Sequence, residues 1–216
     1  TTGTENTSIG TFSMVNSTTG SYNTALGAGA LFSSSEGADN VAIGLEAMRN
    51  TTASDNTAVG YRALKESDGV GNTAVGHSAM ITTTSGANNT ALGRDAGGAT
   101  TTGYENVYIG YQAGTHNTSH QTGAGCVILG PYCDTDAADT AQAIVIGYDV
   151  TGTASTTTLG SGSSDIRTSH GSVNWATVSD ERVKKNITDA TAGLSFINDL
   201  KPRTFKYKNK GDLPET

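Results

Sequence analysis

The sequence is short of the residues from which a conventional globular core is built. Aromatic residues make up only 6% of its 216 residues and hydrophobic residues 35%, whereas glycine alone fills 28 positions. A compact core needs more large apolar side chains than this composition supplies. The composition therefore favours a repetitive or assembled fold over an ordinary globular domain.

Cysteine is nearly absent, which excludes a disulfide scaffold. The spacing of Cys126 and Cys133 matches no zinc pattern, and no histidine pair completes one, so we predict two unlinked, structural thiols. The four histidines lie in loop-like sequence and are predicted to face solvent rather than to bind metal: His77, His116, His120 and His170. No metal site and no cofactor is expected.

Long apolar runs are also missing, so no membrane insertion is expected, and no signal peptide opens the chain. The formal charge is −7, of which residues 179–216 contribute +2 and residues 1–178 contribute −9. An acidic body argues against a nucleic-acid or anionic-membrane partner, and the change of sign predicts a boundary near residue 178. Because the chain begins with Thr1 rather than Met, we expect a fragment of a longer protein.

A repeat of about 17 residues organises most of the chain. Its first half reads NTSIG at 6–10, NTALG at 23–27, NVAIG at 40–44, NTAVG at 56–60 and 72–76, NTALG at 89–93, and NVYIG at 106–110, with degenerate copies at 126–130, 143–147 and 156–160. Its second half follows three residues after the glycine, as serine or alanine and then Met14, Leu31, Met48, Leu64 or Met80, until Gly97 and Gly114 take that place.

Each repeat reads as a short strand, a glycine turn, a second short strand and a polar connector. A helix is excluded, since a glycine every 16 or 17 residues interrupts any 3.6-residue period. The sequence therefore predicts an all-β, parallel β-roll or solenoid whose coils stack on one another. The fourth motif position is predicted to form an internal apolar column (Ile9, Leu26, Ile43, Val59, Val75, Leu92, Ile109), with the preceding alanines (Ala25, Ala42, Ala58, Ala74, Ala91) on the opposite face.

One chain offers few large side chains per coil to offset the entropy of ordering its backbone. We therefore expect further burial against symmetric copies of the same chain.

The repeat closely resembles the head repeat of trimeric autotransporter adhesins of the YadA type and related repeats in phage tail fibres. The resemblance covers about residues 1–147. It implies a left-handed parallel β-roll assembled as a homotrimer.

The charged block SDERVKKNI at 179–187, followed by GLSFINDLKPRTFKY at 193–207, resembles the start of the intramolecular chaperone domain of phage tailspikes and tail fibres, the peptidase S74 family. The resemblance implies an α+β domain that begins at residue 179 and is incomplete here. It implies self-cleavage between Val178 and Ser179, with Ser179 as nucleophile and Lys184 as general base. Residues 148–178, poor in large apolar side chains apart from Trp175, are predicted to be a stalk between roll and chaperone.

The chemistry of this block is sound, because a lysine can activate a serine where burial or nearby cations lower its pKa. Arg182 and Lys185 are close enough in sequence to supply those cations, and Asp180 could hold the backbone turn. The alternative is that Ser179 caps a helix with acids in its first turn and that Lys184 is solvated.

The leading functional prediction is a structural and host-adhesion segment of a trimeric phage tail fibre or spike, matured by autoproteolysis and located in the virion tail after assembly in the host cytoplasm. Its expected partners are its own copies, other tail proteins and a host surface receptor, either a glycan or an outer-surface protein. The alternatives are the head of a bacterial trimeric adhesin and a polysaccharide depolymerase. The depolymerase would need two paired carboxylates, whereas the acids occupy no repeated position: Glu46, Asp55, Glu66, Asp68, Asp95 and Glu105.

Overall fold

The computed structural model describes residues 2–172 and 174–177, and every regular element in this part of the chain is a β-strand. One three-residue strand recurs in each coil, at the first half of the repeat. The strands of this series are β1 (Thr7–Ile9), β2 (Thr24–Leu26), β3 (Val41–Ile43), β4 (Thr57–Val59), β5 (Thr73–Val75), β6 (Thr90–Leu92), β7 (Val107–Ile109) and β8 (Val127–Leu129). The longer β10 (Ile144–Tyr148) and β12 (Thr156–Ser161) continue it.

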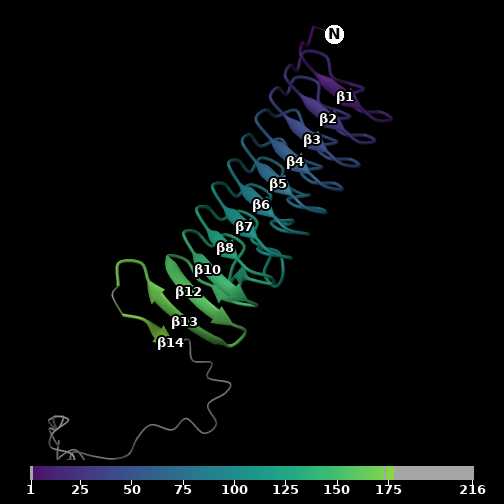
Figure 1. Ribbon diagram of the computed structural model, residues 1–216. Helices are drawn as coiled ribbons and strands as arrows, with labels where there is room; N and C mark the ends of the chain where they lie inside the picture. Colours follow the sequence, from purple (N-terminus) through teal and green to yellow (C-terminus); the bar gives the residue numbers. More distant parts are fainter. Residues whose placement is uncertain (1, 173, 178–216) are drawn as a thin grey trace, which may run out of the picture. The chain divides into compact units, whose positions relative to one another are not determined.

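These strands stack in chain order into one parallel sheet, with each repeat placed directly on the next (Figure 1). Thr24, Ala25 and Leu26 pair with Val41, Ala42 and Ile43, and the same register recurs along the series. The predicted all-β parallel solenoid with a coil of about 17 residues is thus confirmed.

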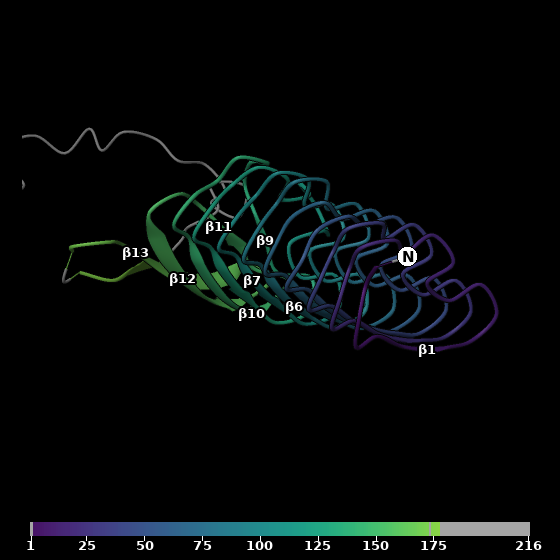
Figure 2. The same ribbon diagram turned by 90° about the horizontal axis from the view of Figure 1, so that it is seen from above.

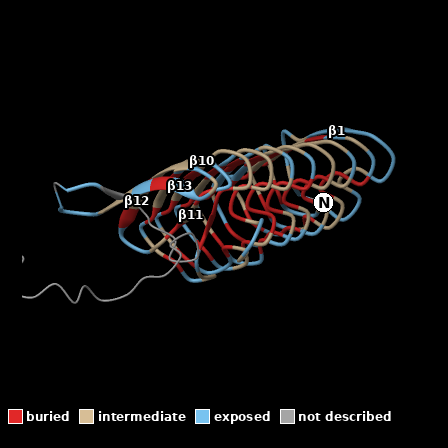
Figure 3. Cartoon of the chain, turned by 90° about the horizontal axis from the view of Figure 1, so that it is seen from below, coloured by how far each residue is buried: buried red, intermediate tan, exposed pale blue. Residues whose placement is uncertain are grey.

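The predicted orientation of the strands is wrong. The alanines at the third motif position face the interior, where Ala25, Ala42 and Ala58 are fully buried, whereas Leu26 is 45% and Leu92 48% exposed. The interior is filled from the opposite wall by the large residues of the second half of the repeat, which are also fully buried: Leu31, Met48, Leu64 and Met80. Because those side chains fill the narrow roll, only a methyl group fits on the strand side in β2 to β6. Buried residues recur from coil to coil along the roll (Figure 3).

The second predicted strand is also wrong, because the second half of the repeat forms turns. Leu31 and Met48 have φ angles of 49° and 47°, in the left-handed region, which bends the chain and aims both side chains inward. These turns still stack, as the Leu31 N–H donates to the Ala47 carbonyl at 3.1 Å. An exception is the short parallel pair β9 (Asp134–Thr135) and β11 (Thr151–Gly152), which lies on a different side of the roll from the long sheet (Figure 2).

Asparagine and glycine hold the two ends of each strand. The Oδ1 atom of Asn23 accepts the backbone N–H of Asn40 at 3.0 Å, and its Nδ2 atom donates to the Gly37 carbonyl at 2.8 Å. The same ladder runs from Asn6 to Asn106. At the other end, Gly27 has a φ of 139°, and a Cβ atom there would collide with the backbone of Gly44.

The parallel stack ends in a reversal of chain direction. β12 pairs in parallel with β10 but antiparallel with β13 (Ser164–Ser169), which in turn pairs antiparallel with β14 (Ala176–Thr177). The predicted boundary between residues 147 and 148 falls inside β10, so the long sheet continues into the segment that we predicted as a stalk. Within the described residues, no helix has the length and apolar character needed to cross a membrane.

Candidate functional site

The outer surface of the long sheet is the first candidate site. Because strand residues alternate, the residues on either side of the buried alanines point outward and form two stacked columns. One of them, the outer apolar column, consists of Ile9, Leu26, Ile43, Val59, Val75, Leu92, Ile109, Leu129 and Ile146. The other is made of threonine, valine and isoleucine, so neither column carries a charge.

The outer apolar column is well exposed in this chain. Ile9 is 61% exposed, and Ile109, deep in the stack, is still 37% exposed. An apolar strip of this length, continuous over successive coils, is unusual on a protein that functions alone. It is suited to contact with another protein surface.

A second candidate lies at the turn that follows each glycine. Rings gather there from coils far apart in sequence, and we call this surface the aromatic corner: Phe12, Phe32, Tyr61, His77, Tyr111, Tyr132 and Tyr148. Ring centroids lie 4.8 Å apart for Tyr61 and His77, 5.2 Å for Tyr111 and Tyr132, and 5.7 Å for Tyr132 and Tyr148. The rings thus form a discontinuous line that runs along the stack of coils.

Charged side chains accompany the aromatic corner as ion pairs, in which Glu46 is shared by two arginines. The Glu46 carboxylate accepts Arg49 Nη1 at 2.7 Å and Arg62 Nε at 2.8 Å, and these contacts, led by the Arg62 hydrogen bond, lower the pKa of Glu46. The two guanidinium groups also lie over rings, Arg49 at 4.9 Å from the Phe32 centroid and Arg62 at 4.8 Å from that of Tyr61.

A groove with a volume of about 200 Å³ opens at the N-terminal end of the aromatic corner. It is lined by Thr11, Phe12, Ala28, Gly29, Phe32, Leu45, Glu46 and Arg49. Phe12 is 67% exposed and Leu45 48%. The groove therefore combines apolar walls with a carboxylate and a guanidinium group.

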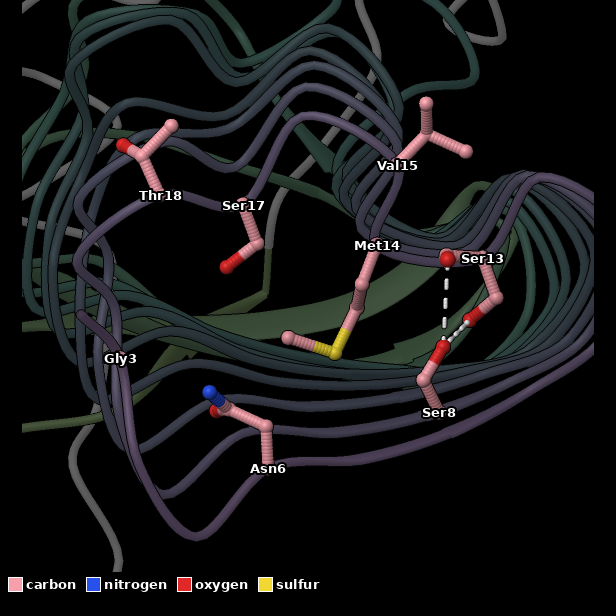
Figure 4. A pocket seen from close by; sticks show the side chains of 8 residues that line it. All are labelled: Gly3, Asn6, Ser8, Ser13, Met14, Val15, Ser17 and Thr18. Atoms are coloured by element: carbon pink, nitrogen blue, oxygen red, sulfur yellow. Dashed lines mark hydrogen bonds between the residues drawn. The ribbon is translucent and has the colours of Figure 1, made fainter. Parts of the chain in front are cut away.

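A second hollow, of about 280 Å³, is the open N-terminal end of the roll interior (Figure 4). Asn6 and Met14 point into it, and Ser8 and Ser13 stand where later coils have buried alanines. The Ser8 hydroxyl donates to Ser13 Oγ at 2.9 Å, so the first coil is more polar than the coils it covers.

The seventh coil departs from the repeat inside the core. Tyr108 replaces the inward alanine, and its ring occupies the space that Gly97 and Gly114 leave by lacking side chains. The Tyr108 hydroxyl lies 2.7 Å from His120 Nδ1, and His120 Nε2 lies 2.7 Å from the Thr140 carbonyl. Since the carbonyl can only accept, Nε2 carries the proton and Nδ1 accepts the phenol hydrogen.

Burial sets the ionisation of this network: it raises the pKa of Tyr108 and lowers that of His120. The prediction that His120 faces solvent is wrong, since its side chain is fully buried. The space for Tyr108 does have a signal in the sequence, because an aromatic residue at an alanine position coincides with glycine at two leucine or methionine positions.

Cys126 and Cys133 are free and buried, as predicted, and burial raises the pKa of both thiols. In the described part of the chain, no group of three or more His, Cys, Asp or Glu side chains is arranged to hold a metal ion. Three of the six acids considered for a depolymerase are engaged in separate ion pairs: Glu46 with two arginines, Glu66 with Lys65, and Asp95 with Arg94.

The residues predicted for self-cleavage lie outside the described residues: Val178, Ser179, Asp180, Arg182, Lys184 and Lys185. The chain divides into two units, Thr1–Val178 and Ser179–Thr216. Trp175, close to that division, is 51% exposed.

Comparison with known proteins gives one finding. Residues 179–216 match the model of the peptidase S74 family, described as "Chaperone of endosialidase". No curated protein and no solved structure matches the chain. The family match and the parallel β-solenoid together fit a phage tail fibre followed by the start of a C-terminal chaperone domain.

Proposed function

We propose that this chain is a structural and host-adhesion segment of a homotrimeric phage tail fibre, released from a C-terminal chaperone by cleavage between Val178 and Ser179. The observation that carries the proposal is the peptidase S74 match, which begins at Ser179. The boundary between the two structural units falls at the same bond. On this proposal the protein works in the virion tail, joined to other tail proteins and facing a receptor on the host.

The outer apolar column supports the trimeric part of the proposal. Its side chains are exposed or half-buried in a single chain, uncharged, and repeated in register along the sheet. Burying such a strip against copies of itself gains apolar contact in every coil, and closed symmetry lets each copy use the same face. The buried alanines behind the strip contribute little apolar area to the core. Contact between the strips of neighbouring copies would add apolar burial that stabilises the roll.

The cleavage step would proceed as an acyl transfer. Ser179 Oγ attacks the carbonyl carbon of Val178 as the Lys184 amine takes the hydroxyl proton. That proton then passes to the Ser179 nitrogen, the C–N bond between Val178 and Ser179 breaks, and an ester joins the Val178 carbonyl carbon to Ser179 Oγ. The resulting ester is then hydrolysed by water, which leaves a carboxylate on Val178. Arg182 and Lys185 would hold the Lys184 pKa low enough for it to act as a base, and Asp180 would order the turn.

Intact mass spectrometry of the full gene product tests the cleavage. The wild type should yield a product that ends at Val178, whereas Ser179→Ala and Lys184→Met should remain whole. Ser163→Ala, an exposed serine in the described hairpin, is the matched control and should cut normally. A wild type that stays whole, or a Ser179→Ala variant that still cuts, would overturn this step.

The family match also separates this proposal from the nearest alternative. A bacterial surface adhesin would share the repeated coils, but it would have no use for a self-cleaving chaperone. Light scattering on the cleaved product tests the proposed trimer, because the measured mass should equal that of three chains.

A further inference from the structure

We infer that the aromatic corner is a binding surface for an uncharged glycan, with the groove at coils one to three as its principal site. This inference rests on the proposed function, since it gives the host-adhesion role a place on the roll and a class of ligand. It begins from the gathering of exposed rings on one line along the roll.

The groove has the two kinds of surface that a sugar ring requires. A pyranose presents C–H groups on its faces and hydroxyl groups at its rim. The faces carry slight positive charge and suit the negative face of an exposed aromatic ring such as Phe12. The rim requires fixed donors and acceptors, which Arg49 and Glu46 supply at the same groove.

Glycine at position 29 is what opens the groove. Equivalent positions in other coils carry side chains at nearly the same backbone angle, with φ of 58° at Phe12, 56° at Glu46 and 54° at Gln112, against 66° at Gly29. The fold therefore accepts a side chain at this position. The missing side chain leaves the space between Phe12 and Glu46 free.

The electrostatics favour an uncharged ligand. The carboxylate of Glu46 is already paired with Arg49 and Arg62, and Asp95 with Arg94. The Glu46 group keeps one positive charge in excess, whereas residues 1–178 as a whole carry −9, so neither an anionic nor a cationic polymer meets a surface of one matching sign. Paired groups of this kind keep hydrogen-bonding capacity without a large net field.

The repetition of rings along the roll favours a polymer. Coils follow one another at the spacing of paired strands, about 4.8 Å. The ring pairs at Tyr61 with His77 and at Tyr111 with Tyr132 extend the surface away from the groove. A chain of sugar units lying along the corner would meet rings and polar groups repeatedly.

A second copy of the chain is a poorer occupant of this corner. Centres of protein interfaces are depleted in charged residues, whereas ion pairs occur here in several coils. The uncharged outer apolar column already offers a better surface for copies.

The test is binding of the cleaved product of the full gene to a microarray of neutral and anionic oligosaccharides, followed by titration with the neutral oligosaccharide that gives the strongest signal. We expect binding to neutral members, and a loss of affinity of about tenfold or more in Phe12→Ala and Gly29→Gln. Gly29→Gln should fold normally, because Gln112 occupies the equivalent position. Tyr22→Ala removes a ring that is 55% exposed but precedes its strand, so it should bind like the wild type.

Each other outcome overturns the inference. Absence of binding to any neutral member, a preference for anionic members, or equal affinity in all variants would do so. A change of oligomeric state in Phe12→Ala would show that copies occupy the corner. Light scattering and mass spectrometry on the same samples separate the two proposals: a cleaved trimer without glycan binding overturns only the inference, whereas an uncut monomer overturns the proposed function.

Discussion

One tyrosine and one histidine give the core its only buried aromatic network among the described residues. Tyr108, His120 and the Thr140 carbonyl form a chain of hydrogen bonds that closes inside the roll. Every polar atom of the imidazole is satisfied in its neutral form, so protonation of His120 would replace an acceptor by a donor facing the phenol. The network should make folding sensitive to acid.

The first prediction concerns this acid sensitivity. Burial lowers the pKa of His120 in the folded chain, so the unfolded chain binds its proton at higher pH. Stability should therefore be complete above the ordinary histidine pKa of about 6.5 and fall as pH drops below it, by up to about 1.4 kcal/mol per pH unit, until the lowered pKa is reached. Thermal unfolding between pH 7.5 and 5 should show a steeper loss in wild type than in His120→Gln. If the stability of both proteins fell equally with pH, the loss of stability would come from other titratable groups.

Burial of His120 could not be predicted from its neighbours in sequence. Its partners Tyr108 and Thr140 are 12 and 20 residues away, and they meet only because the seventh coil is lengthened. The aromatic corner was more accessible to prediction, since Tyr61, His77 and Tyr111 share one place in the repeat. Alignment of the repeats by their glycines would have placed them in a single column.

At the scale of the element, spacing was sufficient to predict the coils but not the direction of each strand. A three-residue strand with alanine between two larger residues reads equally well either way, because the pattern alternates in both. The choice is made by Leu31, Met48 and their equivalents, which enter the same interior from turns. The sequence pattern predicts a strand for the second half of the repeat, and a strand would not turn both of these side chains into the interior.

The second prediction concerns the glycine that ends each strand. Gly60 has a φ of 137°, and a Cβ atom there would collide with the backbone of Gly76. Gly60→Ala should therefore lower the free energy of unfolding by about 3 kcal/mol or more, from strain and overpacking combined. Gly162→Ala is the control, because its Cβ would meet no atom within 4 Å and only strain of about 1 kcal/mol remains. Denaturant unfolding compares the two, and equal losses would refute the close approach of the coils.

At the scale of the whole molecule, the exposure of the outer apolar column has no explanation in a single chain. The third prediction is that Leu26→Asp, Val59→Asp and Leu92→Asp together convert the proposed trimer into monomers, since carboxylates at an apolar interface lose their hydration. The coils should persist, because these side chains point away from the interior.

Light scattering measures whether the variant is a monomer, and circular dichroism measures whether its coils persist. Val70→Asp, on a connector where the side chain is 49% exposed, is the control and should leave the mass unchanged. A triple variant that keeps the mass of the wild type would show that copies meet elsewhere or not at all.

The irregular seventh coil affects the register in which the coils pair as the chain folds. Because the coils are nearly identical, a strand could pair with a strand one repeat away from its native partner at little cost in free energy. The Tyr108 ring lies between Gly97 and Gly114, and a slip by one repeat would set it against Met80 in place of Gly97. The tyrosine and its two glycines thus favour one register of the stacked coils, because every shifted register has a higher energy.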